Sequence, residues 1–314
     1  MQTEEILYKG KQVYYRKSGN GPLVMLLHGF GEDGEIWKEQ YNIFPGHTLL
    51  VPDLPGSGRS EAVEDMSMEG LADVVKAIIE KEGRPLTPGG GGTAITQSMP
   101  VNNSDHATTS LQSGSSALDL PSFGGAGGGP ECILIGHSMG GYITLAFAEK
   151  YPALLKGFGL FHSSAFADSE EKKETRQKGI RFIQEHSATE FLRTATPNLY
   201  APSTRERHPE WIEAHLEQVR NFSAGSLVSY YRSMMERPDR TFILQNSAVP
   251  VLFVMGRHDT AVPLSDGLKQ CYLPQLAYIH ILENSGHMGM IEEASVANAI
   301  LSQFVSTIEN KACT

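Results

Sequence analysis

The sequence contains few cysteines, a deficit of basic residues and no long apolar run. Its three cysteines, Cys132, Cys271 and Cys313, lie far apart, and they fit neither a zinc-binding spacing nor a disulfide framework. No stretch approaches the roughly 20 consecutive apolar residues of a membrane-spanning helix. Residues 1–5 are acidic in character and lack the basic and apolar regions of a signal peptide. We therefore expect a soluble protein of a reducing cytoplasm, without a membrane partner.

Acidic residues outnumber basic ones, since the 314 residues include 36 Asp and Glu but only 26 Lys and Arg, for a formal net charge of −10. A protein that binds the phosphate backbone usually presents a basic face, so this balance argues against a nucleic-acid partner. The length suits one large α/β domain with an inserted segment. The oligomeric state stays open.

Apolar runs alternate with helical periodicity along most of the chain. Continuous apolar runs are typical of strands buried on both faces of a parallel sheet, and they occupy residues 23–27, 48–51, 132–135, 157–161, 249–255 and 277–282. Helical patterns occupy residues 68–81, 140–150 and 293–308. Residues 6–8 and 12–17 flank Lys9-Gly10 as a hairpin. The alternation predicts an α/β fold with a doubly wound, mostly parallel sheet.

Residues 163–240 interrupt this alternation with a charged, helical and proline-punctuated segment between two core strands. We interpret the segment as a helical lid over one edge of the sheet. Its aromatic and apolar side chains either attach the lid to the body or line an apolar substrate pocket. The residues that we predict to line such a pocket, within the lid and at the end of the preceding strand, are Phe161, Tyr200, Trp211, Tyr231 and Met234.

A second interruption, residues 83–130, connects a helix to a strand, where about 2–6 residues are usual. It begins and ends with glycine runs around a segment rich in Ser, Thr, Asn and Gly. Such a composition cannot bury enough apolar surface to offset its ordering entropy. We interpret it as a low-complexity insertion, flexible or engineered, between the two pieces of the first core part, 1–82 and 131–162. Residues 241–314 form the last part of the core.

The segment Gly136-His137-Ser138-Met139-Gly140 matches the pattern G-x-S-x-G. It follows the apolar run 132–135 and precedes the helical pattern 140–150. A turn of this kind between strand and helix holds the serine in a strained backbone conformation and exposes its hydroxyl at the end of the sheet. The alternative is a glycine-rich turn with an inert serine.

Several segments together resemble the α/β-hydrolase fold family, in the order in which that family carries them. Besides the serine turn, they are His28-Gly29-Phe30-Gly31, Asp53-Leu54-Pro55-Gly56-Ser57-Gly58-Arg59-Ser60, Gly256-Arg257-His258-Asp259 and Gly286-His287. Each follows a predicted strand, and the resemblance covers the whole chain except residues 83–130.

The resemblance implies a catalytic triad in the family's chain order of serine, acid and histidine. Ser138 would be the nucleophile, His287 the general base and then the general acid, and Asp259 the residue that orients His287 and stabilises its charged form. Alternatively, Asp259 is a turn or cap residue, in which case Asp266 or Asp53 would be the acid. We interpret Asp53 as a brace of its own turn.

The family's oxyanion hole implies two backbone N–H donors, from Met139 after the nucleophile and from Phe30 in the preceding loop. No metal site or cofactor-binding fingerprint occurs, and we expect no cofactor. Dehalogenases and epoxide hydrolases of this fold carry an aspartate where Ser138 stands, so the sequence argues against both.

The leading hypothesis is a serine hydrolase that cleaves a small-to-medium carboxylic ester through an acyl-enzyme, so that the partner is a small ester-like molecule. One alternative is hydrolysis or lysis of a carbon–carbon bond in a dicarbonyl-type substrate, which the same triad and lid can serve. An alternative from another class is a small-ligand binding protein on the same fold. Fold alone does not choose among them.

Overall fold

A computed structural model describes residues 1–83 and 131–311. In that part of the chain eight strands form one sheet. The strands are β1 (Gln2–Tyr8), β2 (Lys11–Ser18), β3 (Leu23–Leu27), β4 (Thr48–Pro52), β5 (Cys132–His137), β6 (Leu155–Phe161), β7 (Val251–Gly256) and β8 (Ala277–Leu282). Their spatial order is β1-β2-β4-β3-β5-β6-β7-β8.

The sheet is antiparallel only at one end. The pairs β1–β2 and β2–β4 are antiparallel, and every pair from β4 across to β8 is parallel. All residues of β3, β4 and β5 are buried, because helices cover both faces of the sheet centre. The predicted doubly wound, mostly parallel sheet is therefore confirmed.

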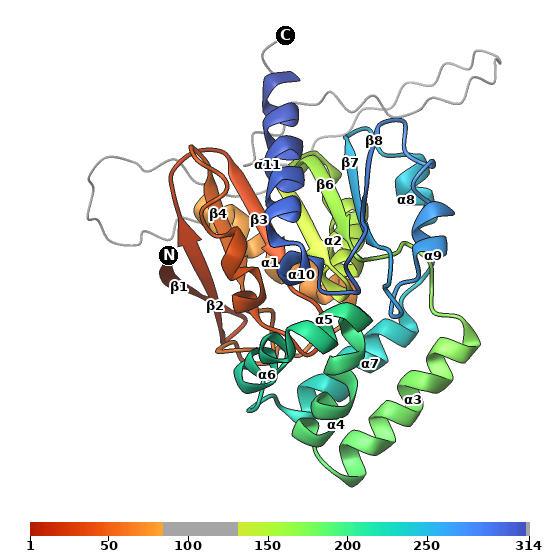
Figure 1. Ribbon diagram of the computed structural model, residues 1–314. Coiled ribbons are helices and arrows are strands. Elements are labelled where there is room, and N and C mark those ends of the chain that lie inside the picture. Colours follow the sequence, from red (N-terminus) through yellow and green to blue (C-terminus); the bar gives the residue numbers. More distant parts are fainter. Residues whose placement is uncertain (84–130, 312–314) are drawn as a thin grey trace, which may run out of the picture.

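The helices of the core lie on the two faces of the sheet. They are η1 (Gly34–Gln40), α1 (Met68–Glu82), α2 (Met139–Lys150), η2 (Pro152–Leu154), α8 (Thr241–Gln245), α9 (Leu264–Leu268), α10 (Gly289–Glu292) and α11 (Ala294–Lys311). One apolar core joins α1 and α2 to the sheet, and the other joins η1, α10 and α11 to its opposite face. Figure 1 shows α10 and α11 on the near face.

Between β6 and β7 the chain forms a group of helices that we name the cap helices. They are α3 (Glu170–Glu185), α4 (Ala188–Ala195), η3 (Thr196–Leu199), α5 (Pro202–Arg207), α6 (Pro209–Gln218) and α7 (Ala224–Glu236). Ser169, Ser187 and Ser223 each accept a hydrogen bond from a backbone N–H in the first turn of α3, α4 and α7, which fixes where those helices begin. In Figure 1 the cap helices gather at the lower end of the sheet.

The predicted elements differ from the observed ones mainly at their ends. The first hairpin is longer than its apolar residues indicate, since β1 begins at Gln2. The last predicted helix, 293–308, corresponds to α11, and the short helix α10 that precedes it was not predicted. Within the described residues, no helix is both long and apolar enough to span a membrane. The predicted insertion lies outside the described residues except for Gly83.

A buried ion cluster joins the cap helices to the body. The side chain of Asp168, fully inaccessible to solvent, accepts hydrogen bonds from Arg176 Nε at 2.6 Å and forms an ion pair with Arg237 Nη1 at 2.9 Å. Arg176 lies in α3, Arg237 follows α7, and the guanidinium of Arg237 lies 3.7 Å from the ring centroid of Tyr142 in α2. The cluster therefore connects both long cap helices to the helix that follows Ser138.

We expect Asp168→Asn to lower the free energy of unfolding by about 3–5 kcal/mol, because it leaves two buried cations without their counter-charge. Burial raises the pKa of Asp168, but Arg176 and Arg237 outweigh it and hold the pKa below its ordinary value. The stabilisation is therefore complete above about pH 4, the unfolded value, and declines as the pH falls through the folded pKa. Urea titrations at pH 7 and at lower pH measure both effects.

The matched control is Glu170→Gln on the same helix, where the carboxylate is 86% exposed and pairs with Lys173 at the surface. Exposed pairs contribute little, so this variant should unfold near the parental midpoint. Equal midpoints for Asp168→Asn and Glu170→Gln would contradict the role of the cluster.

Candidate active site

Ser138 occupies the turn between β5 and α2 with φ 51° and ψ −116°, a left-handed conformation that costs free energy for any residue other than glycine. Two glycines allow the turn to close. A Cβ added at Gly136 would lie 2.2 Å from the carbonyl of Gly140, and one added at Gly140 would lie 2.7 Å from the carbonyl oxygen of Leu27. The expected strained serine turn is therefore present at the carboxyl end of β5.

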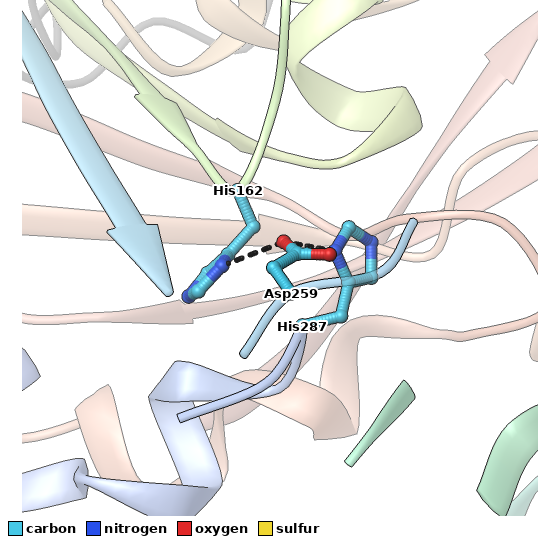
Figure 2. Close-up of side chains that lie close together, drawn as sticks. All are labelled: His162, Asp259 and His287. Atoms are coloured by element: carbon cyan, nitrogen blue, oxygen red, sulfur yellow. Dashed lines mark hydrogen bonds and ion pairs between the residues drawn. The ribbon is translucent and has the colours of Figure 1, made fainter. Parts of the chain in front are cut away.

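Asp259 and His287 meet at the same edge of the sheet, after β7 and β8. His287 Nδ1 donates to Asp259 Oδ2 at 2.7 Å, and both side chains are buried (Figure 2). The other carboxylate oxygen, Oδ1, accepts from the backbone N–H groups of Ala261 at 2.9 Å and Val262 at 2.8 Å. Asp259 thus does serve as a turn residue through Oδ1, and it also binds the imidazole through Oδ2.

The charges of this pair are set by burial and by each other. Burial raises the pKa of Asp259, but the charge of His287 and the hydrogen bonds from His162 and His287 lower it much further, to well below the ordinary carboxyl value. Burial lowers the pKa of His287, whereas Asp259 raises it by its charge and hydrogen bond, with a net increase. An ionised Asp259 keeps the proton of neutral His287 on Nδ1 and leaves Nε2 as the basic atom.

The two predicted oxyanion donors lie beside Ser138. Met139 is the first residue of α2, and Phe30 follows Gly29, where an added Cβ would lie only 3.1 Å from Ser138 Cβ. Among the hydrogen bonds of the described residues, none uses the backbone N–H of Phe30 or of Met139. The same range contains no hydrogen bond from the Ser138 hydroxyl to His287.

A buried pair, Glu32 and His137, connects the three loops around Ser138. The sequence analysis did not predict this pair. Glu32 Oε2 accepts from the Gly29 backbone N–H at 2.7 Å and from His137 Nδ1 at 3.0 Å. His137 Nε2 donates to the backbone carbonyl of His287 at 3.0 Å. Both nitrogens of His137 face acceptors, so one shared proton must lie between the ring and Glu32. Burial raises the pKa of Glu32, but His137 lowers it to about 2, so Glu32 presents a carboxylate to the His137 ring.

We expect Glu32→Gln to lower kcat by about 10–100-fold with little change in KM, because misplacement of catalytic loops by about 1 Å can cost this much. The glutamine removes the carboxylate that both the Gly29 backbone N–H and His137 Nδ1 contact. Steady-state kinetics on a substrate of the parent measure the effect. Glu35→Gln is the control, since Glu35 lies in η1 and pairs with Arg16 at 2.6 Å. Parental kcat in Glu32→Gln would contradict a role of the pair in loop placement.

The fallback acids lie in other networks. Asp53 Oδ1 binds Arg16 Nη1 at 2.6 Å and the Gly34 backbone N–H at 3.0 Å, while Oδ2 accepts from the Arg59 backbone N–H at 3.1 Å. It therefore braces its turn, as predicted. Asp266 lies in α9 and pairs with Lys269 at 3.3 Å.

The predicted pocket residues have different surroundings. Tyr231 stacks on Phe30 with ring centroids 4.2 Å apart. Tyr200 follows Leu199, whose carbonyl accepts from the His287 backbone N–H at 2.6 Å. Trp211 stacks on His208, and Phe161 and Met234 are buried in the cores on opposite faces of the sheet. Contact of all five with substrate stays a prediction.

A second histidine binds the same carboxylate oxygen as His287. His162, directly after β6, donates from Nδ1 to Asp259 Oδ2 at 3.0 Å, and Figure 2 shows the two rings on either side of Asp259. One donor atom from each of the three residues lies within 4.8 Å of the others. A metal ion there would have to displace the protons of both Nδ1 atoms.

Comparison with known proteins places this architecture among the α/β hydrolases. The Alpha/beta hydrolase family matches residues 24–299. The chain is 26% identical to 2-hydroxy-6-oxo-6-phenylhexa-2,4-dienoate hydrolase of Comamonas testosteroni, over 93% of this chain and 91% of that protein. The chain therefore belongs to the alpha/beta hydrolase family, and it is a hydrolase with a small-molecule substrate.

Solved structures share the fold throughout. A thermophilic esterase from Thermogutta terrifontis superposes with a TM-score of 0.78 at 22% identity, covering 98% of this chain and 99% of the esterase. The enol-lactonase from Burkholderia xenovorans superposes with a TM-score of 0.75 at 18% identity, covering 96% of this chain and all of the lactonase. At these identities the likeness concerns the fold.

Proposed function

We propose that the protein is a serine hydrolase that cleaves a small-to-medium carboxylic ester through an acyl-enzyme. The observation that carries this proposal is the left-handed backbone of Ser138 at the same edge of the sheet as the buried Asp259–His287 pair. A strained non-glycine residue persists where the surrounding structure enforces it, and such residues cluster at active sites. The tautomer that Asp259 imposes on His287 is the one that a general base needs.

In the proposed reaction, Ser138 Oγ attacks the ester carbonyl carbon while His287 Nε2 takes the hydroxyl proton. The carbonyl oxygen becomes an oxyanion that accepts hydrogen bonds from the backbone N–H groups of Phe30 and Met139. Collapse breaks the bond to the alcohol oxygen, which takes the proton from His287. Water then repeats the sequence on the acyl-enzyme, and the carboxylic acid leaves.

The helical segment 163–240 enters this proposal as a lid. The stacking of Tyr231 on Phe30 and the bond from His287 to Leu199 support it, since cap residues then border both the oxyanion loop and the base. Within the lid proposal, Tyr231 is the pocket residue with the strongest support, and Tyr200 is buried in the same apolar core as Phe161. Phe161 and Met234, which are buried in the apolar cores, would support the pocket wall from the side away from the substrate.

The second candidate is hydrolysis of a carbon–carbon bond next to a ketone. The relative from Comamonas testosteroni, which bears the name of a phenylhexadienoate hydrolase, supports this candidate across nearly the whole length of both chains. The same serine and histidine would serve, but the leaving group would be a carbon that must be protonated. The likeness to the esterase from Thermogutta terrifontis, at 22% identity, concerns the fold and does not choose between the two bonds.

A two-substrate assay separates the candidates. The parent protein is offered p-nitrophenyl butyrate and 2-hydroxy-6-oxo-6-phenylhexa-2,4-dienoate, and kcat/KM is compared. Preference for the butyrate supports ester hydrolysis, and preference for the dienoate by orders of magnitude assigns the carbon–carbon bond. Turnover of neither, with tight binding of a small ligand, would favour the binding-protein alternative.

A further inference from the structure

His162 occupies a position that the structure maintains at a cost. It has φ 49° although it is not glycine, and it is buried. Two glycines make room for its ring: a Cβ added at Gly289 would lie 2.4 Å from His162 Nε2, and one added at Gly256 would lie 2.8 Å from its Cε1. The reaction proposed above does not use this residue, so its strained, enclosed placement calls for another role.

The protonation of His162 follows from its partners. Nδ1 faces Asp259 Oδ2 at 3.0 Å, and a carboxylate oxygen only accepts, so Nδ1 carries a proton. Nε2 is buried and has no partner among the described residues. Burial lowers the pKa of His162 to about 4, although Asp259 acts in the opposite direction. His162 is therefore a neutral donor at pH 7.

This donor completes the coordination of Asp259. Oδ1 accepts from two backbone N–H groups, and Oδ2 accepts from His162 and from His287 at 2.7 Å. Four donors fix the plane of the carboxylate. Because both histidines use the same oxygen, a hydrogen bond from His162 withdraws charge from the atom that stabilises the imidazolium of His287.

We propose that His162 is a positioning residue of the reaction, which fixes the plane of the Asp259 carboxylate and takes a share of the negative charge that Asp259 offers to His287. The inference rests on the proposed function of Asp259 and His287. Its consequence is that His287 stays unprotonated, and able to accept the serine proton, to a lower pH than it would with Asp259 alone.

The other groups around the two rings do not change with residue 162. His162 faces Asp259, His287 and His137. The ring centroids of His162 and His137 lie 6.1 Å apart. Besides Asp259, the carboxylates of Glu32 and Glu292 act on His287. A substitution at position 162 changes none of these residues, so we expect a difference in the titration of His287 between the two variants to report the lost donor.

Two substitutions separate the hydrogen bond from the packing. His162→Asn places an amide N–H near the position of Nδ1, tolerates a positive φ and does not titrate. His162→Phe keeps a ring of similar size but has no N–H. Thermal unfolding of both variants shows whether each retains the fold.

The test is an NMR titration of the His287 imidazole in the parent and in both variants, with ester hydrolysis against pH as a second readout. In His162→Phe the undivided charge of Asp259 should raise the pKa of His287 by roughly one unit, since hydrogen bonds to charged groups have this magnitude. The acid limb of kcat/KM should move to higher pH by the same amount. In His162→Asn the pKa of His287 and the acid limb of kcat/KM should both stay close to their parental values.

An unchanged titration of His287 in folded His162→Phe would overturn the proposal, and so would equal shifts in both variants. If His162→Phe does not fold, a parental titration in His162→Asn supports the proposal and a raised one overturns it. The NMR readout needs no turnover. Failure of the proposed function, seen as absence of ester hydrolysis by the parent, is thus distinguishable from failure of the inference.

Discussion

Replacing Ser138 by alanine is expected to lower kcat for the parent's substrate by up to about 10⁶-fold, the loss seen when a triad nucleophile is removed. The covalent step disappears, because alanine offers no atom to attack the carbonyl carbon. Substrate affinity should change little, since the oxyanion donors and the cap residues stay in place. Residual catalysis from those groups sets the floor of the measurement.

Single-turnover kinetics and a binding assay with a non-hydrolysable ester analogue measure the two effects. The control is Ser302→Ala, which removes a hydroxyl from α11 that donates to the Ile43 carbonyl at 2.9 Å. This control should keep parental kcat. A Ser138→Ala variant within tenfold of the parent would contradict nucleophilic catalysis by Ser138.

Asp259→Asn is expected to lower kcat on the order of 10⁴-fold, because the amide cannot hold His287 in the tautomer with its proton on Nδ1. Both oxygens of Asp259 accept two hydrogen bonds each. In either orientation of the asparagine amide, its N–H₂ group therefore faces two donors. The pKa of His287 should fall, since burial then acts without the opposing charge of Asp259. The acid limb of kcat/KM should therefore move to lower pH as the overall rate drops.

Asp266→Asn is the matched control, because Asp266 is the other acid that follows β7. Its carboxylate pairs with Lys269 at 3.3 Å and with Lys172 at 3.7 Å. This variant should retain parental kcat. The reverse result, with Asp266→Asn inactive and Asp259→Asn active, would assign the acid to α9.

The sheet could be predicted because the residue pattern of each strand follows from how the strand is buried. A strand covered by helices on both faces is a nearly continuous apolar run, as in β3 and in residues 132–136 of β5, and that pattern is local in the chain. The serine turn could be predicted for a similar reason. Gly136 is required by its contact with Gly140, four positions later, and the glycine–serine–glycine pattern between a strand and a helix is local in the chain.

The partners of Asp259 beyond His287 could not be predicted. His162 lies 97 positions before Asp259, and Glu32 lies 105 positions before His137, so only the assembled sheet edge brings them together. No spacing distinguishes His162 from the other histidines of the chain, and the place of His137 before Ser138 does not indicate its partner. Each pair forms because neighbouring parallel strands end at the same edge, where single side chains meet across loops.

The cap helices could be predicted only in part. Their helical character follows from composition and from the serine caps, but the surface that each helix presents depends on packing between helices. Tyr231 therefore reaches Phe30, whereas Met234, three positions later on α7, is buried against the body. Both were predicted for the pocket on residue type alone.

The most direct measurement is the mass of the protein after reaction with a fluorophosphonate, followed by peptide mapping. The account predicts one adduct per chain, on Ser138, formed by the parent, by Ser302→Ala and not by Ser138→Ala. Labelling should slow as the pH falls and His287 becomes protonated. An unlabelled parent, or an adduct on another serine that persists in Ser138→Ala, would contradict the central claim that Ser138 is the activated nucleophile.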